Sequence, residues 1–172
     1  MACILTTGRK LPCKDVVGGI SEVLFADFGT LGNATISNSE VTAFSGTPDI
    51  YKYDVKSASG LEQTINSSDE NGTTFYDQSV TLVLTKLDKE TQSELSALIV
   101  ARPHCFVKTN NGKYFAVGMT RGCSTSGTIT SGQALGDLTG YTLTIMAQEP
   151  LMSLFVDATM IETFVSGTQI AP

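Results

Sequence analysis

Apolar and polar residues alternate over several stretches of the chain, a spacing typical of β-strands that bury one face. In residues 78–87, one face is formed by Val80, Leu82 and Leu84. Residues 140–147 follow the same rule, with an apolar face of Tyr141, Leu143, Ile145 and Ala147. Residues 21–28 are apolar on both faces, which predicts a strand buried on both sides.

One stretch has helical spacing instead. A single side of an α-helix would carry Thr91, Leu95, Leu98, Ile99 and Arg102. Asp88 can accept hydrogen bonds from the free N–H groups of the first turn, and Pro103 stops the helix. The pattern therefore predicts one amphipathic helix over about residues 88–102 in an otherwise β-rich chain.

Turn residues predict two hairpins. Ile50–Ser67 reads as two alternating strands joined by a loop at Ser57–Gly60. Asn111-Gly112 separates two further strands and predicts a type I′ turn, in which both central residues have positive φ. The remaining strand candidates are 34–37, 41–44 and the polar stretch 125–131, which we expect at an edge or facing solvent.

The chain divides into a main body and two flanking segments. Residues 1–19 are interrupted by Pro12 and Gly18-Gly19 and predict an N-terminal arm. Residues 20–150 form the main domain. Residues 151–172 are too apolar for a disordered tail, so we expect an arm that docks on a neighbour or strands that join the core.

The composition favours a protein whose surface is partly covered by partners. The chain has 172 residues, of which 41% are hydrophobic and only 16% charged. This charged share lies below the roughly 25% of ordinary soluble domains. The net charge of −6 disfavours sequence-specific DNA binding, because an acidic surface repels phosphate. No signal peptide is expected, because Arg9, Lys10 and Lys14 follow the short apolar start Met1–Leu5 instead of preceding it. No membrane span is expected, because no apolar run approaches about 18–20 residues.

Nothing in the sequence predicts catalysis. His104 and Cys105 are adjacent, so on a strand they face opposite sides and cannot form a nucleophilic pair. We therefore expect Cys105 to be a small core residue. No phosphate-binding loop motif is present. We predict no catalytic residue, no cofactor-binding residue and no metal ligand.

The cysteines and carboxylates are scattered. Zinc-binding spacing is absent among Cys3, Cys13, Cys105 and Cys123, and reduced thiols are favoured over two disulfides. Asp69-Glu70 is expected to be a solvated pair in a loop. The other acids are scattered along the chain and form no motif: Asp27, Glu40, Asp49, Asp54, Glu62, Asp77 and Asp137.

The order of elements after residue 73 resembles the tail tube proteins of tailed bacteriophages. The resemblance rests on the strand from Gln78, the helix that ends before Pro103, the hairpin Val107–Gly118 and the segment Ser131–Pro150. It covers about half of the chain. It lies in the order of the elements and the general character of their sequences, without an invariant motif.

The resemblance implies a β-sandwich or partly closed barrel with one flanking helix. It implies stacked hexameric rings that form a hollow tail tube conducting DNA, built in the host cytoplasm and located in the virion. Some of the scattered acids would then line the channel and keep the DNA mobile. The expected partners are copies of the chain itself, with sheath, baseplate or terminator proteins as further candidates. Two alternatives remain open: another minor tail, baseplate or terminator component, and a β-sandwich binding module.

Overall fold

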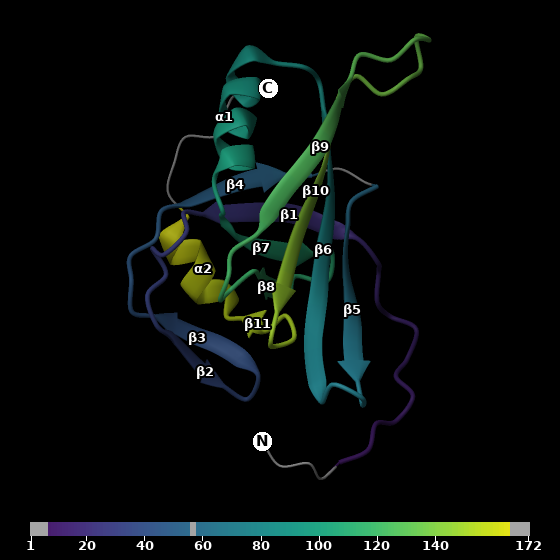
Figure 1. Ribbon diagram of the computed structural model, residues 1–172. Coiled ribbons are helices and arrows are strands. Elements are labelled where there is room, and N and C mark those ends of the chain that lie inside the picture. The colour runs from purple at the N-terminus through teal and green to yellow at the C-terminus, as the bar shows by residue number, and fades with distance from the viewer. Residues whose placement is uncertain (1–6, 56–57, 166–172) are drawn as a thin grey trace.

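The strand β1 (Ile20–Ala26) lies at the centre of the protein and is buried on both faces, as its sequence predicts. The computed structural model describes residues 7–55 and 58–165. It shows a mainly β protein, 46% strand and 12% helix, in which two open sheets form a sandwich (Figure 1). The strands β1, β4 and β7 run across the direction of β6 and β10.

The larger sheet has seven strands in the order β2-β3-β11-β8-β7-β1-β4. All neighbours are antiparallel except β3 and β11. Its other strands are β2 (Ala34–Ser37), β3 (Glu40–Phe44), β4 (Ile50–Asp54), β7 (His104–Thr109), β8 (Tyr114–Val117) and β11 (Phe155–Val156).

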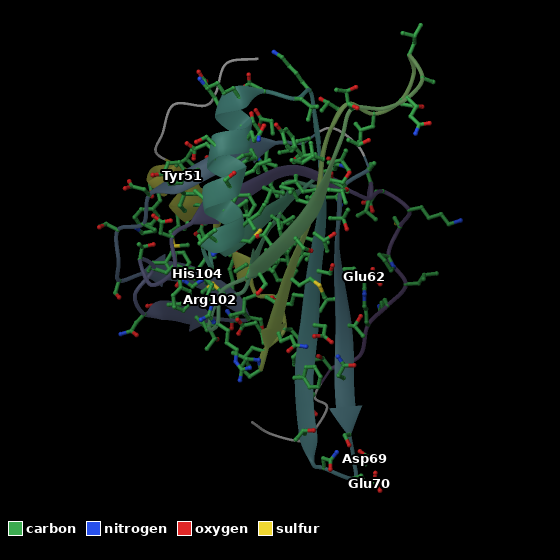
Figure 2. The ribbon with its side chains drawn as sticks, turned by 45° about the horizontal axis from the view of Figure 1, so that its top comes forward. Tyr51, Glu62, Asp69, Glu70, Arg102 and His104 are labelled. Atoms are coloured by element: carbon green, nitrogen blue, oxygen red, sulfur yellow. The ribbon has the colours of Figure 1, made fainter. Side chains whose placement is uncertain are left out.

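The smaller sheet has four antiparallel strands in the order β5-β6-β10-β9. Their bounds are β5 (Gly60–Ser68), β6 (Thr73–Thr85), β9 (Ser124–Thr130) and β10 (Gly140–Glu149). Beyond Tyr76, which pairs with the last residue of β10, the strands β5 and β6 continue as a two-stranded hairpin. This hairpin projects past the end of the sandwich (Figure 2).

The main core lies between the two sheets and is closed at one side by α1 (Lys89–Val100). The alternating faces of β6 and β10 bury Val80, Leu82, Leu143 and Ile145, as predicted. Asp88 caps α1 by accepting a hydrogen bond from the Thr91 N–H. Leu95 and Leu98 are buried, whereas Ile99 is 50% exposed, so its predicted place in the apolar stripe was wrong.

A second core lies on the other face of the seven-stranded sheet. It contains Leu24 and Ala26 of β1 and Ile161 of a second helix, α2 (Ala158–Phe164). The sequence pattern predicted one helix, because seven residues are too few to establish a helical period. The apolar segment after Pro150 thus supplies a short strand and a helix to the core.

The predicted hairpin Ile50–Ser67 was wrong. Its two strands belong to different sheets, because β4 pairs with β1 and β5 pairs with β6. The hairpin instead joins β5 and β6 through Asp69–Gly72, where Gly72 has φ +60°. Alternation identified both strands correctly but cannot identify the partner of a strand.

The turn between β7 and β8 also differs from its prediction. Only Gly112 has positive φ, and its N–H donates to the carbonyl of Thr109. The Thr109 N–H donates to the carbonyl of Lys113. These bonds define a type I turn followed by a glycine bulge rather than a type I′ turn.

Candidate assembly surface

The outer face of the four-stranded sheet is covered mainly by hydroxyl side chains. The strand register places Thr81, Thr144 and Ser126 in one row across β6, β10 and β9. The rows on either side contain Ser79, Met146 and Ser124, and Val83, Thr142 and Thr128. The residues that alternate with these along β6 and β10 point into the main core. The hydroxyl-rich face is therefore the side of the sheet turned away from the sandwich.

This face carries no positive charge. None of the strands β5, β6, β9 and β10 contains Lys or Arg. Glu62 and Asp77 lie on the outer face, whereas Glu149 is 3% exposed and points toward the sandwich. Such a surface repels phosphate and offers it no cationic partner.

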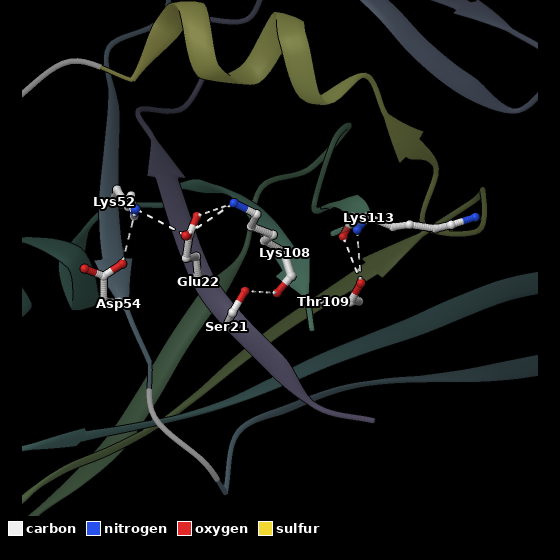
Figure 3. Close-up of polar contacts among 7 residues, drawn as sticks. All are labelled: Ser21, Glu22, Lys52, Asp54, Lys108, Thr109 and Lys113. Atoms are coloured by element: carbon white, nitrogen blue, oxygen red, sulfur yellow. Dashed lines mark hydrogen bonds and ion pairs between the residues drawn. The ribbon is translucent and has the colours of Figure 1, made fainter. Parts of the chain in front are cut away.

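The seven-stranded sheet, in contrast, contains lysines, which are paired with acidic side chains. Glu22 forms ion pairs with Lys52 and Lys108 on neighbouring strands, with N–O distances of 3.2 and 3.3 Å (Figure 3). Lys52 also contacts Asp54 at 3.3 Å. These charges neutralise one another on β1, β4 and β7, so the two sheets present chemically different faces.

Both edges of the four-stranded sheet are open. Within the described residues, β5 pairs only with β6, and β9 pairs only with β10. Edge strands of monomeric proteins are usually protected by Lys, Pro or a covering element. Here β5 has nine residues with the single charge of Glu62, and β9 has seven residues without charge or proline. These edges are suited to pairing with another chain.

The arm before β1 is attached at its base and otherwise exposed. The Asn111 side chain both donates to the Val17 carbonyl and accepts from the Val17 N–H. Asn110 donates to the carbonyls of Gly18 and Gly19. The turn between β7 and β8 therefore clamps the base of the arm, from which residues 7–16 extend.

A buried polar cluster joins the two sheets. His104 is 4% exposed; its Nδ1 lies 2.8 Å from the Gly118 carbonyl and its Nε2 accepts from the Gly29 N–H at 3.2 Å. Burial lowers the pKa of His104, which favours the neutral ring with a proton on Nδ1. Gln78 of β6 accepts from the Gly118 N–H, so residues of both sheets meet at this glycine.

The same cluster forms one wall of a hollow of about 380 Å³. Glu149 accepts from the N–H groups of Thr120 and Arg121. The rim is apolar and half exposed at Phe28, Ile36 and Met152. Since the polar groups in the wall are hydrogen-bonded to backbone, the arrangement explains the local fold and supplies no paired acid and base.

Cys105 points into the main core, on the face opposite His104, as predicted. Burial raises the pKa of Cys123 to about 12 and that of Cys105 well above its usual range, so both thiols stay protonated at neutral pH. Cys13, Cys105 and Cys123 are free, and Cys3 lies outside the described residues. No group of three His, Cys, Asp or Glu side chains suited to a metal occurs in the part of the chain that the structure describes.

Comparisons with protein-family models, curated proteins and solved structures gave no significant match. Among residues 7–55 and 58–165, no helix is long and apolar enough to cross a membrane. The features that sequence reasoning missed are the two open edges and the Lys-free face. The sequence did contain a signal for a face without positive charge, because residues 58–85 contain four acids and no Lys or Arg.

Proposed function

We propose that the chain is a structural subunit that assembles with copies of itself into stacked rings around a channel, as in the tail tube of a tailed bacteriophage. The observation that carries the proposal is the four-stranded sheet, whose two edge strands each pair with one strand only among the described residues, and its hydroxyl-rich outer face without Lys or Arg.

The open edges explain how a ring would form. The strand β9 of one copy pairs with β5 of the next, which satisfies the free N–H and C=O groups of both edges. Because β5 and β9 are different strands, the contact is heterologous, and it closes into a ring when the rotation between copies permits. The ring then has a continuous inner sheet.

The outer face explains what the channel would conduct. Once the edges are paired, the hydroxyl-rich face lines the lumen, with Glu62 and Asp77 as its charged groups. DNA would meet hydroxyls and carboxylates but no lysine or arginine, so it would pass without being held. The proposed location is therefore the virion tail, and the proposed role requires no cofactor and no catalysis.

The edge contact is testable with one exposed residue. Ile129 lies on β9 and is 63% exposed. We expect Ile129→Asp to leave the fold intact and to abolish higher oligomers in sedimentation velocity, because a carboxylate on a paired edge would be desolvated.

The control for this variant is Ile36→Asp, which introduces the same charge at a half-exposed residue of β2, in the seven-stranded sheet. It should assemble like the unchanged chain. Equal assembly of both variants would contradict the edge contact, and a free-standing binding module would then become the better explanation.

A further inference from the structure

We propose that the hollow of about 380 Å³ beside the end of β10 binds a small organic ammonium ion, that is, a primary amine with an apolar body. Glu149 makes the polar contact with the ammonium group, and the apolar body lies against the side chains of the rim. All lining residues belong to one copy of the chain. The inference is therefore independent of the proposed self-assembly.

Glu149 is a buried carboxylate with unused hydrogen-bonding capacity. It is the last residue of β10 and is 3% exposed. Its Oε1 accepts from the N–H groups of Thr120 at 3.0 Å and Arg121 at 2.8 Å. No residue that the structure describes donates to its Oε2. Because a buried carboxylate oxygen without a partner is costly, a donor that enters the hollow is stabilised there.

No cation of the protein neutralises this carboxylate. Within residues 7–55 and 58–165, Glu149 forms no ion pair. The guanidinium group of Arg102 lies over Phe28, 5.4 Å from the ring centroid, and donates to the carbonyl of Arg121. The side chain of Arg121 is exposed. The unpaired negative charge therefore selects a cationic ligand.

The other buried polar side chains of the wall already have partners. Both ring nitrogens of His104 are hydrogen-bonded to backbone groups. Gln78 accepts from the Gly118 N–H and donates to the Leu151 carbonyl. A ligand thus finds its main polar anchor at Glu149. An ammonium group can donate to this carboxylate, whereas an anion such as phosphate would be repelled.

The rest of the lining accounts for the apolar body of the ligand. Phe28, Ile36 and Met152 at the rim are about half exposed, so their apolar surface lies in water until a ligand covers it. Met119 also lines the hollow. Thioether side chains adapt to irregular shapes and make favourable contacts with aromatic rings. This lining favours an amine that carries an aromatic or branched apolar group.

The size of the hollow agrees with this class of ligand. Small-molecule sites usually have volumes of about 300–1,000 Å³. The hollow lies near the lower end of this range. It therefore fits a compact amine rather than a large cofactor.

A titration with two matched probes tests the site in the unchanged chain. Phenethylammonium has the proposed chemistry, and phenethyl alcohol has the same apolar body without the charge. Binding is followed by NMR of the methionine methyl groups below the concentration at which the chain assembles. Met119 and Met152 line the hollow, whereas Met146 lies on the outer face of β10 and serves as the internal control.

We expect saturable shifts of the Met119 and Met152 signals with phenethylammonium, at a Kd of about 1 mM or tighter. Phenethyl alcohol should bind at least about tenfold more weakly, because it cannot form the charge-assisted hydrogen bond. The signal of Met146 should not move.

Glu149→Gln tests the anchor directly. The amide oxygen can still accept from Thr120 and Arg121, so the fold should persist, as circular dichroism would verify. We expect this variant to bind phenethylammonium at least about tenfold more weakly than the unchanged chain and phenethyl alcohol about equally. Glu70→Gln makes the same change at an exposed residue of the β5–β6 turn and should bind like the unchanged chain.

Three outcomes would overturn the inference. Absence of shifts at about ten times the expected Kd would show that the hollow binds no such ligand. Equal affinity for the two probes, or unchanged binding by Glu149→Gln, would remove the role of the carboxylate. Binding by Arg121→Ala but not by the unchanged chain would show that the Arg121 side chain itself occupies Glu149. None of these results bears on ring formation, which is scored separately by electron microscopy.

Discussion

His104 shows how a single buried side chain fixes the local structure. It is the one histidine of the chain, and both of its ring nitrogens are hydrogen-bonded to backbone groups of different loops. Phe28 stacks on the ring with the two centroids 5.1 Å apart. A protonated ring could not accept the Gly29 N–H, so the native arrangement requires the neutral form.

This requirement makes stability depend on pH. Burial lowers the pKa of His104 below its ordinary value of 6.5, so the unfolded chain binds the proton at a higher pH than the folded chain. The stabilisation is complete above about pH 6.5 and is lost as the pH falls through 6.5 toward the lower pKa of the folded state.

We expect the free energy of unfolding, measured with urea, to decrease between pH 7.5 and 5.5. His104→Asn keeps a donor for the Gly118 carbonyl and loses the Gly29 bond, so it should cost about 1–3 kcal/mol at pH 7.5. Its stability should change less with pH than that of the unchanged chain. An identical pH dependence in the two proteins would contradict the role given to His104.

At the scale of the element, the orientation of α1 can be tested by comparing a buried residue of the helix with a half-exposed one. Leu95→Ala should lower the free energy of unfolding by about 2–5 kcal/mol, because this side chain is 3% exposed in the main core. Ile99→Ala should change it by at most about 1 kcal/mol, because Ile99 is half exposed and most of its surface is already in water. Chemical denaturation of both variants checks the difference, and equal losses would show that α1 packs in another orientation.

Elements were more predictable than their partners. The two apolar faces of β1 and the alternation of β6 and β10 identified buried strands correctly, because side-chain direction in a strand is a local property. The false hairpin Ile50–Ser67 failed because sheet membership depends on contacts far along the chain. The helix α2 was missed because its short sequence carries only a capping residue, Asp157, as a local signal.

The candidate surface was predictable only in part. The sequence shows that residues 58–85 lack Lys and Arg, and it suggested that some acids face a channel. It could not show that Glu62 and Asp77 share a face with the hydroxyls of β9 and β10, because that neighbourhood is created by the strand register. The open edges likewise appear only once the sheet order is known.

At the scale of the whole molecule, the charge of the proposed lumen can be changed at side chains that point away from the core. Ser126 and Thr128 are exposed on the outer face of β9. Assemblies of the Ser126→Lys and Thr128→Lys double variant should retain double-stranded DNA in co-sedimentation, and added salt should release it. The Gln double variant is the neutral control and should not retain DNA. Retention by the unchanged chain would contradict a non-adhesive channel.

The central claim is that this protein builds a hollow assembly from copies of itself. Negative-stain electron microscopy of the purified chain at high concentration and near-physiological salt tests it most directly. The account predicts rings, or tubes of stacked rings, with a central channel. A field of featureless monomers at every concentration would contradict it.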